Sequence, residues 1–172
     1  MFHGTSAGFR ADRENTMPKT IPCLWFDGQA EQAAEHYLSI FPNSTILDVT
    51  RYGPNSMGPE GSVMTVNFSL DGQEYVGLNG GPQFPFTEAI SLQIHCADAA
   101  EVDHYWNALG AGGEEGPCGW LKDKFGLSWQ VVPTALFALI SDPDPARAER
   151  ATQAMLKMGK LDIDELQRAA DG

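Results

Sequence analysis

The sequence predicts an α+β fold in which a strand–helix–strands unit occurs twice, followed by a C-terminal helical tail. Three observations carry this prediction. Apolar residues recur at helical spacing in two segments, short β-prone runs flank both segments, and the pattern near the C-terminus becomes helical throughout. With 172 residues, of which 42% are hydrophobic, the chain is long enough for one sizeable core but short for two full domains.

The first copy of the unit occupies residues 21–80. A β-prone run ends at the turn pair Asp27-Gly28, and the helix that follows stops at Pro42-Asn43. Asp71-Gly72 lies between two alternating runs and is a strong two-residue hairpin signal. Strands are therefore expected over residues 21–26, 45–52, 62–70 and 73–79, and a helix over 29–41.

The second copy, residues 90–133, is shorter. Asp98 and Glu101 have the spacing of a capping box, and Gly110 suits a helix end. Strands are expected over residues 90–96, 114–122 and 127–132, with a helix over 98–109. The strand over 114–122 is weak, because glycines interrupt it.

The two copies form one predicted domain over residues 17–133. Residues 1–16 are polar and mixed in charge, typical of a disordered extension or a cloning remnant. Residues 134–172 form the helical tail, with helix starts at Asp142-Pro143-Asp144-Pro145 and at Asp162. We expect this tail to dock either on its own core or on a second subunit, and we favour the second subunit.

Charge and cysteine usage restrict the partners and the compartment. Eleven basic and 23 acidic residues give a net charge of −12, which disfavours nucleic acid and anionic membranes and leaves a neutral or cationic small molecule, or another protein. Cys23, Cys96 and Cys118 form an odd set without CxxC spacing, so we expect free thiols and a cytoplasmic location. No apolar run approaches the length of a membrane span.

The usual catalytic motifs are absent from the sequence. There is no GxSxG, no phosphate-binding GxxxxGK[ST], no HExxH and no GxGxxG after a strand. His95 alone among the four histidines falls in a predicted strand, where alternation places it on one face with Ser91 and Gln93. Gln130 lies in the last strand, and glutamine is a weak neutral ligand for transition metals. No metal and no cofactor are predicted.

Several segments together resemble one known family. They are Leu24–Ala30, Ile40–Ser44, Gly61–Val66, Leu78–Pro82, Cys118–Asp123 and Phe125–Pro133. From about Met17 onward the chain resembles the PhnB-like proteins, which carry the label 3-demethylubiquinone-9 3-methyltransferase domain. These belong to the vicinal oxygen chelate superfamily, with glyoxalase I and the bleomycin-resistance proteins. The resemblance implies paired βαβββ modules that form curved mixed sheets around a cleft, and a homodimer.

The resemblance also implies which residues would hold a metal ion, and the family label implies that a methyl donor is bound. Metal-dependent members of the superfamily place their ligands at positions that correspond here to Pro22, Gly77 or Asn79, Ser91 and Gln130. None of these is His, Asp or Glu, so we expect a metal-free cleft. The glycine-rich turn and the acidic strand end that usually bind S-adenosylmethionine are also missing, so methyl transfer is not expected.

The functional prediction is a cleft that binds a small organic molecule. Asn79, Ser91, Gln93, Trp129 and Gln130 are the expected binding residues, and His95 is the only candidate for proton transfer if a reaction is catalysed. One alternative is a drug- or metabolite-sequestering protein without turnover, and another is an interaction protein with a vestigial cleft. A metal-dependent lyase, isomerase or dioxygenase is the remaining alternative, and it requires a metal site that the sequence does not reveal.

Overall fold

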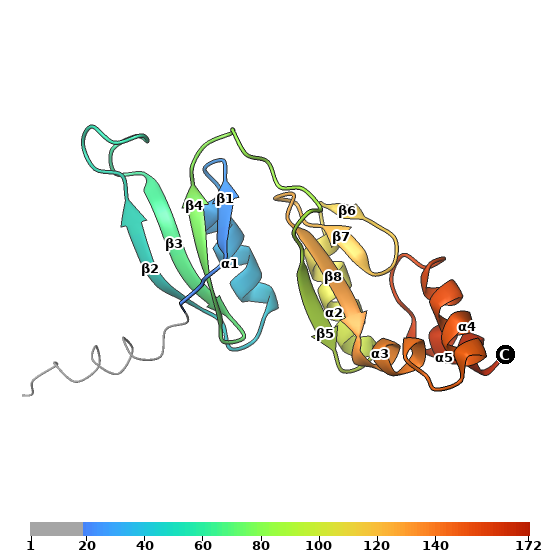
Figure 1. The fold of residues 1–172 in the computed structure, drawn as a ribbon. Coiled ribbons are helices and arrows are strands. Elements are labelled where there is room, and N and C mark those ends of the chain that lie inside the picture. Colours follow the sequence, from blue (N-terminus) through green and yellow to red (C-terminus); the bar gives the residue numbers. More distant parts are fainter. Residues whose placement is uncertain (1–18) are drawn as a thin grey trace, which may run out of the picture.

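The computed structural model describes residues 19–172 and contains two similar modules and a helical tail (Figure 1). The first module has a four-stranded sheet in the order β1-β4-β3-β2, in which β1 runs parallel to β4 and the other neighbours are antiparallel. Its elements are β1 (Cys23–Phe26), α1 (Ala30–Ile40), β2 (Thr45–Arg51), β3 (Val63–Leu70) and β4 (Gln73–Asn79). The expected hairpin at Asp71-Gly72 is confirmed, with left-handed φ values of 44° and 85°.

The second module repeats this topology with the order β5-β8-β7-β6. Its elements are β5 (Leu92–Cys96), α2 (Ala99–Gly110), β6 (Glu114–Glu115), β7 (Trp120–Lys122) and β8 (Ser128–Pro133). The capping box is confirmed, because Asp98 accepts from the amide of Glu101 while the Glu101 carboxylate accepts from the amide of Ala97. The paired βαβββ modules confirm the predicted fold class. The single strand expected over 114–122 is wrong in detail, since a turn containing Gly116 and Gly119 divides it into β6 and β7.

The helix-covered faces of both sheets meet in one hydrophobic core. Tyr37 of α1 and Phe41, the residue that follows α1, pack against Trp129 of β8, with ring centroids 5.3 and 5.5 Å from that of Trp129. The buried core residues come from both modules and include Leu24, Phe26, Ala33, Val66, Phe68, Ile94, Val102, Trp106, Leu109, Leu121 and Val131. Because the helices cover these inner faces, the opposite face of each sheet, which we call its open face, lies on the outside of the core.

A buried carboxylate joins the two modules within this core. Asp123, which is 3% exposed, accepts hydrogen bonds from the Tyr37 hydroxyl at 2.7 Å and from Trp129 Nε1 at 2.8 Å. Its other oxygen accepts from the amides of Phe125 at 2.8 Å and Leu127 at 3.1 Å. Burial, and then the adjacent carboxylate, raise the pKa of Tyr37 well above its ordinary value, so the phenol stays protonated and donates.

The tail consists of α3 (Thr134–Ile140), α4 (Pro145–Met155) and α5 (Ile163–Asp171). The sequence predicted α4 and α5, including the Asp162 cap that accepts from the amide of Glu165, but it missed α3. The three helices form a second hydrophobic cluster that includes Val132 of β8. The amides of Cys118 and Gly119 donate to the carbonyls of Met158 and Gly159 at 2.7 and 2.8 Å.

The tail packs on its own chain, which is the alternative that the sequence analysis did not favour, and a contact of the tail with a second subunit stays a prediction. The physical reason for the packing is that the apolar Val132 of β8 lies on the open face, and the chain turns back to bury it. None of the described helices is long and apolar enough to cross a membrane. The prediction for residues 1–16 lies outside the described residues.

Candidate functional site

A chain of hydrogen bonds runs across the open face of the second sheet. Gln130 Nε2 donates to Ser91 Oγ at 2.8 Å, and Gln93 Nε2 donates to Gln130 Oε1 at 3.2 Å. Gln93 Oε1 lies 2.8 Å from His95 Nε2. The structure thus brings together four of the six residues that the sequence predicted for the site.

Strand alternation and register place these side chains. Leu92, Ile94 and Cys96 of β5 point into the core, so Gln93 and His95 between them lie on the open face. The parallel register of β5 and β8 sets Gln93 directly beside Gln130. The antiparallel register of β7 and β8 sets Trp120 opposite Gln130, so Trp120 also belongs to this face.

The tail borders the same face. The rings of His95 and Phe137 of α3 meet edge to face, with centroids 5.2 Å apart. Val132, the next residue of β8 on this face after Gln130, is buried in the hydrophobic cluster of the tail. The polar part of the open face is therefore limited at one end by α3, while the end near Trp120 is not covered by α3.

Two predicted site residues are placed elsewhere. Trp129 lies on the opposite face of β8, is 2% exposed and fills the core, where its Nε1 donates to Asp123. Asn79 belongs to the first module, where its Oδ1 accepts from the amide of Ala30 at 2.8 Å and its Nδ2 donates to the carbonyl of Val63 at 3.1 Å. The side chain of Asn79 thus holds the start of α1 against β3 and has no described hydrogen bond to the polar chain of the second sheet.

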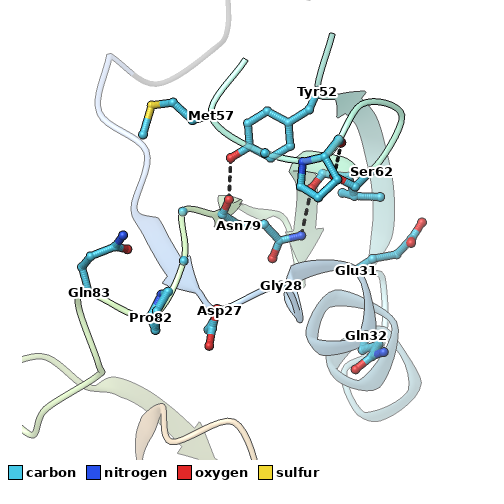
Figure 2. Close-up of a pocket in the computed structure, with 15 residues that line it drawn as sticks. Asp27, Gly28, Glu31, Gln32, Tyr52, Met57, Ser62, Asn79, Pro82 and Gln83 are labelled. Carbon is cyan, nitrogen blue, oxygen red and sulfur yellow. Dashed lines mark hydrogen bonds between the residues drawn. The ribbon is translucent and has the colours of Figure 1, made fainter. Parts of the chain in front are cut away.

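Asn79 also lines a separate hollow of about 610 Å³ at the end of the first module. Figure 2 shows the Tyr52 hydroxyl pointing at the main chain of Asn79, to whose carbonyl it donates at 2.6 Å. Asp27, Glu31 and Gln32 lie on the opposite side of this hollow. The side-chain amide and the carbonyl of Asn79 are already hydrogen-bonded within the protein, so Asn79 is not free to bind a ligand in this hollow.

The residues at the superfamily's metal-ligand positions do not fit a metal ion. Ser91 and Gln130 offer a neutral hydroxyl and a neutral amide that are bonded to each other, Gly77 has no side chain, and Asn79 caps a helix. Within residues 19–172, no three His, Cys, Asp or Glu side chains form a group that could hold a metal. Divalent transition ions prefer imidazole, thiolate and carboxylate ligands, which this face does not offer as a set.

Cys96, the neighbour of His95 in β5, is not activated as a nucleophile. Burial, and then Glu101 and Asp98, raise the pKa of Cys96 to about 11, so its thiol is protonated at neutral pH. Cys96 also points into the core rather than toward the polar chain. His95 is consequently the only titratable side chain in the hydrogen-bonded chain on the open face.

The fold and this site define a protein built from paired βαβββ modules with a polar open face. The sequence profile of the 3-demethylubiquinone-9 3-methyltransferase family matches residues 18–132, and the chain belongs to this family, whose members are PhnB-like. None of the curated proteins matches significantly. The matched residues end before the tail.

Two solved structures illustrate the similarity. A PhnB protein from Bacillus cereus, titled after the same methyltransferase, is 34% identical and has a TM-score of 0.62; the match covers 68% of this chain and 100% of that one. Protein PA1353 from Pseudomonas aeruginosa is 20% identical, with a TM-score of 0.56, covering 68% of this chain and 98% of that one. The second similarity concerns the fold alone.

Proposed function

We propose that the protein binds a small organic molecule on the open face of its second sheet, without a metal ion. The observation that carries this proposal is the hydrogen-bonded chain Ser91–Gln130–Gln93–His95, which gathers neutral donors and acceptors on one surface. Amide and hydroxyl groups of this kind fix the orientation of an organic ligand through its own polar atoms. Trp120 beside Gln130 supplies an aromatic surface for the rest of the molecule.

A homodimer would complete the cleft. Among the described strands, β1 pairs only with β4 and β5 pairs only with β8, so each sheet has one unpaired edge formed by a parallel strand. Such edges are normally covered, because their free amides and carbonyls otherwise pair with other chains. Pairing with a second copy along these edges would place the open face of one module next to that of another. Light scattering is expected to give about twice the chain mass of 18.7 kDa.

The ligand is tested first by native mass spectrometry of the purified protein, with extraction and identification of any bound molecule. Gln130→Leu and Gln93→Leu should then weaken binding of that molecule by about five- to 150-fold, which corresponds to about 1–3 kcal/mol for an unmatched hydrogen-bonding group. Gln73→Leu at the exposed start of β4 is the matched control and should leave binding unchanged. Equal binding by Gln130→Leu and the parent protein would refute the site.

The same site serves either a binding protein or an enzyme, and His95 separates the two. If the ligand is a substrate, His95 is the group that moves a proton, with Gln93 orienting its ring through the 2.8 Å contact. His95→Ala then abolishes turnover while weakening binding only modestly. If the protein sequesters its ligand, the parent protein returns the molecule chemically unchanged after prolonged incubation.

A further inference from the structure

A hollow of about 410 Å³ lies beside Trp120, at the end of the open face that α3 does not cover. It is formed by the β6–β7 turn, the start of β8 and the linker before β5. Its lining includes Glu88, Glu114, Glu115, Cys118, Trp120 and Ser128. Ser128 and Gln130 lie on the same face of β8, so the hollow continues the site proposed above.

The hydroxyl of Ser128 is the first sign of a ligand here. Ser128 is 1% exposed, and its Oγ has no hydrogen-bond partner among residues 19–172. Leaving a buried hydroxyl unpaired costs about 1–3 kcal/mol, and native structures keep few such groups. A hydrogen-bonding group of a bound molecule would satisfy it.

The charge around the hollow is the second sign. Three carboxylates, those of Glu88, Glu114 and Glu115, line it, and Lys122 is the single cation among its lining residues. Lys122 pairs with Glu88 at 2.5 Å, and Glu115 Oε1 accepts from Trp106 Nε1 at 3.1 Å. Lys122 also lies opposite Glu114 across β6 and β7, so one cation serves two of the three carboxylates. The lining therefore keeps two more acidic than basic side chains beside the Trp120 ring, and both an aromatic face and carboxylates favour a cation.

We propose that this hollow binds a protonated amine with an apolar or aromatic body and a hydrogen-bonding group at its other end. The ammonium lies near Glu114 and Glu115, the body packs on Trp120, and the polar end pairs with the Ser128 hydroxyl. This inference rests on the proposed function, since it names the class of ligand for the same open face. A volume of this size is within the usual range for small-molecule pockets.

Four matched probes test the proposal by calorimetry. Tyramine has the amine and a phenol, phenethylamine lacks the phenol, tyrosol replaces the amine by a hydroxyl, and 3-(4-hydroxyphenyl)propionate replaces it by a carboxylate. Tyramine is expected to bind at least tenfold more tightly than the carboxylate and more tightly than either partial analogue. Equal affinities for the amine and the carboxylate would overturn the proposal.

Variants assign the effect to residues. Glu114→Gln should weaken tyramine binding about three- to tenfold without affecting tyrosol, and Glu149→Gln in α4 is the control with unchanged binding. Ser128→Ala should abolish the preference for tyramine over phenethylamine. Because the Ser128 hydroxyl is unpaired in the free protein, the same variant should also be at least as stable as the parent in urea; a clear loss of stability would contradict the assignment.

Failure of this inference and failure of the proposed function give different results. If a molecule is found whose binding requires Gln130 while tyramine does not bind at millimolar concentration, only the amine inference is wrong. If tyramine binds and responds to Glu114→Gln and Ser128→Ala but not to Gln130→Leu, the hollow is a site and the hydrogen-bonded chain is not part of it.

Discussion

Removing the Tyr37 hydroxyl tests whether Asp123 holds the two modules together. In Tyr37→Phe, the carboxylate loses the donor at 2.7 Å from α1 but keeps Trp129 Nε1 and the amides of Phe125 and Leu127. A hydrogen bond to a charged group contributes about 1.5–3 kcal/mol. The ring itself stays, so no cavity forms, and the expected loss in the free energy of unfolding is about 1.5–3 kcal/mol.

Asp123→Ala is expected to be more damaging. It leaves the Tyr37 hydroxyl, Trp129 Nε1 and two amides without their acceptor in a site that is 3% exposed. Removing the acceptor of several buried donors costs at least about 3–5 kcal/mol, similar to breaking a buried ion pair. In a double-mutant cycle the two changes should be strongly non-additive, because both remove the same hydrogen bond.

Urea unfolding followed by far-ultraviolet circular dichroism and by tryptophan fluorescence measures these losses, at one protein concentration because a dimer's stability depends on it. Tyr75→Phe is the matched control, since Tyr75 is half-buried and its hydroxyl has no hydrogen bond to the described residues. The control should stay within about 0.5 kcal/mol of the parent. A Tyr37→Phe variant as stable as this control would refute the role of Asp123 as the joint.

Three further predictions concern the tail and pH. Leu161→Ala should lower the free energy of unfolding by about 2–5 kcal/mol, because Leu161 is 2% exposed within the tail's hydrophobic cluster; a loss below 1 kcal/mol in urea would contradict tail docking in cis. Asp162→Ala should remove about 1 kcal/mol by the same measurement, since it deletes the acceptor for the Glu165 amide at the start of α5. Burial, and then Lys124, lower the pKa of His36 below its ordinary 6.5. Between the two pKa values, His36 is protonated in the unfolded chain and neutral in the folded chain. The free energy of unfolding should therefore fall as the pH drops from about 6.5 through the lowered pKa of the folded state. The urea midpoints at pH 7.5 and 5.5 should differ less in His36→Gln than in the parent protein. An equal difference in both proteins would exclude His36 as the cause.

The limits of sequence-based prediction are clear at the site. Alternation in a strand is a local property, so the shared face of Ser91, Gln93 and His95 followed directly from the sequence. Their connection to Gln130 depends on the β5–β8 register, which pairs residues 37 positions apart. Trp120 was not among the site residues predicted from the sequence. Its position opposite Gln130 depends on where the chain breaks between β6 and β7, and the sequence did not show that break.

Two other predicted site residues lie away from the polar chain for the same reason. Trp129 was expected to bind ligand, but its indole N–H faces the buried Asp123 carboxylate, and only the folded loop between β7 and β8 brings this acceptor within 2.8 Å. Asn79 matched a family motif, but its amide is used for the start of α1, 49 residues earlier in the chain. The buried, unpaired Ser128 hydroxyl has no signature in the sequence, because burial is a property of the packed structure.

The sequence alone determined the repeated strand–helix–strands units, the hairpin at Asp71-Gly72 and the capped starts of α2, α4 and α5, because spacing and turn chemistry act between residues close in the chain. Only the tertiary structure decided that the helix-covered faces of the two modules share one core, that the tail packs on its own chain, and which polar side chains meet on the open face. These outcomes depend on which helices and sheets, far apart in the sequence, pack against each other. Many such packing arrangements are compatible with the same local pattern of hydrophobic and polar residues.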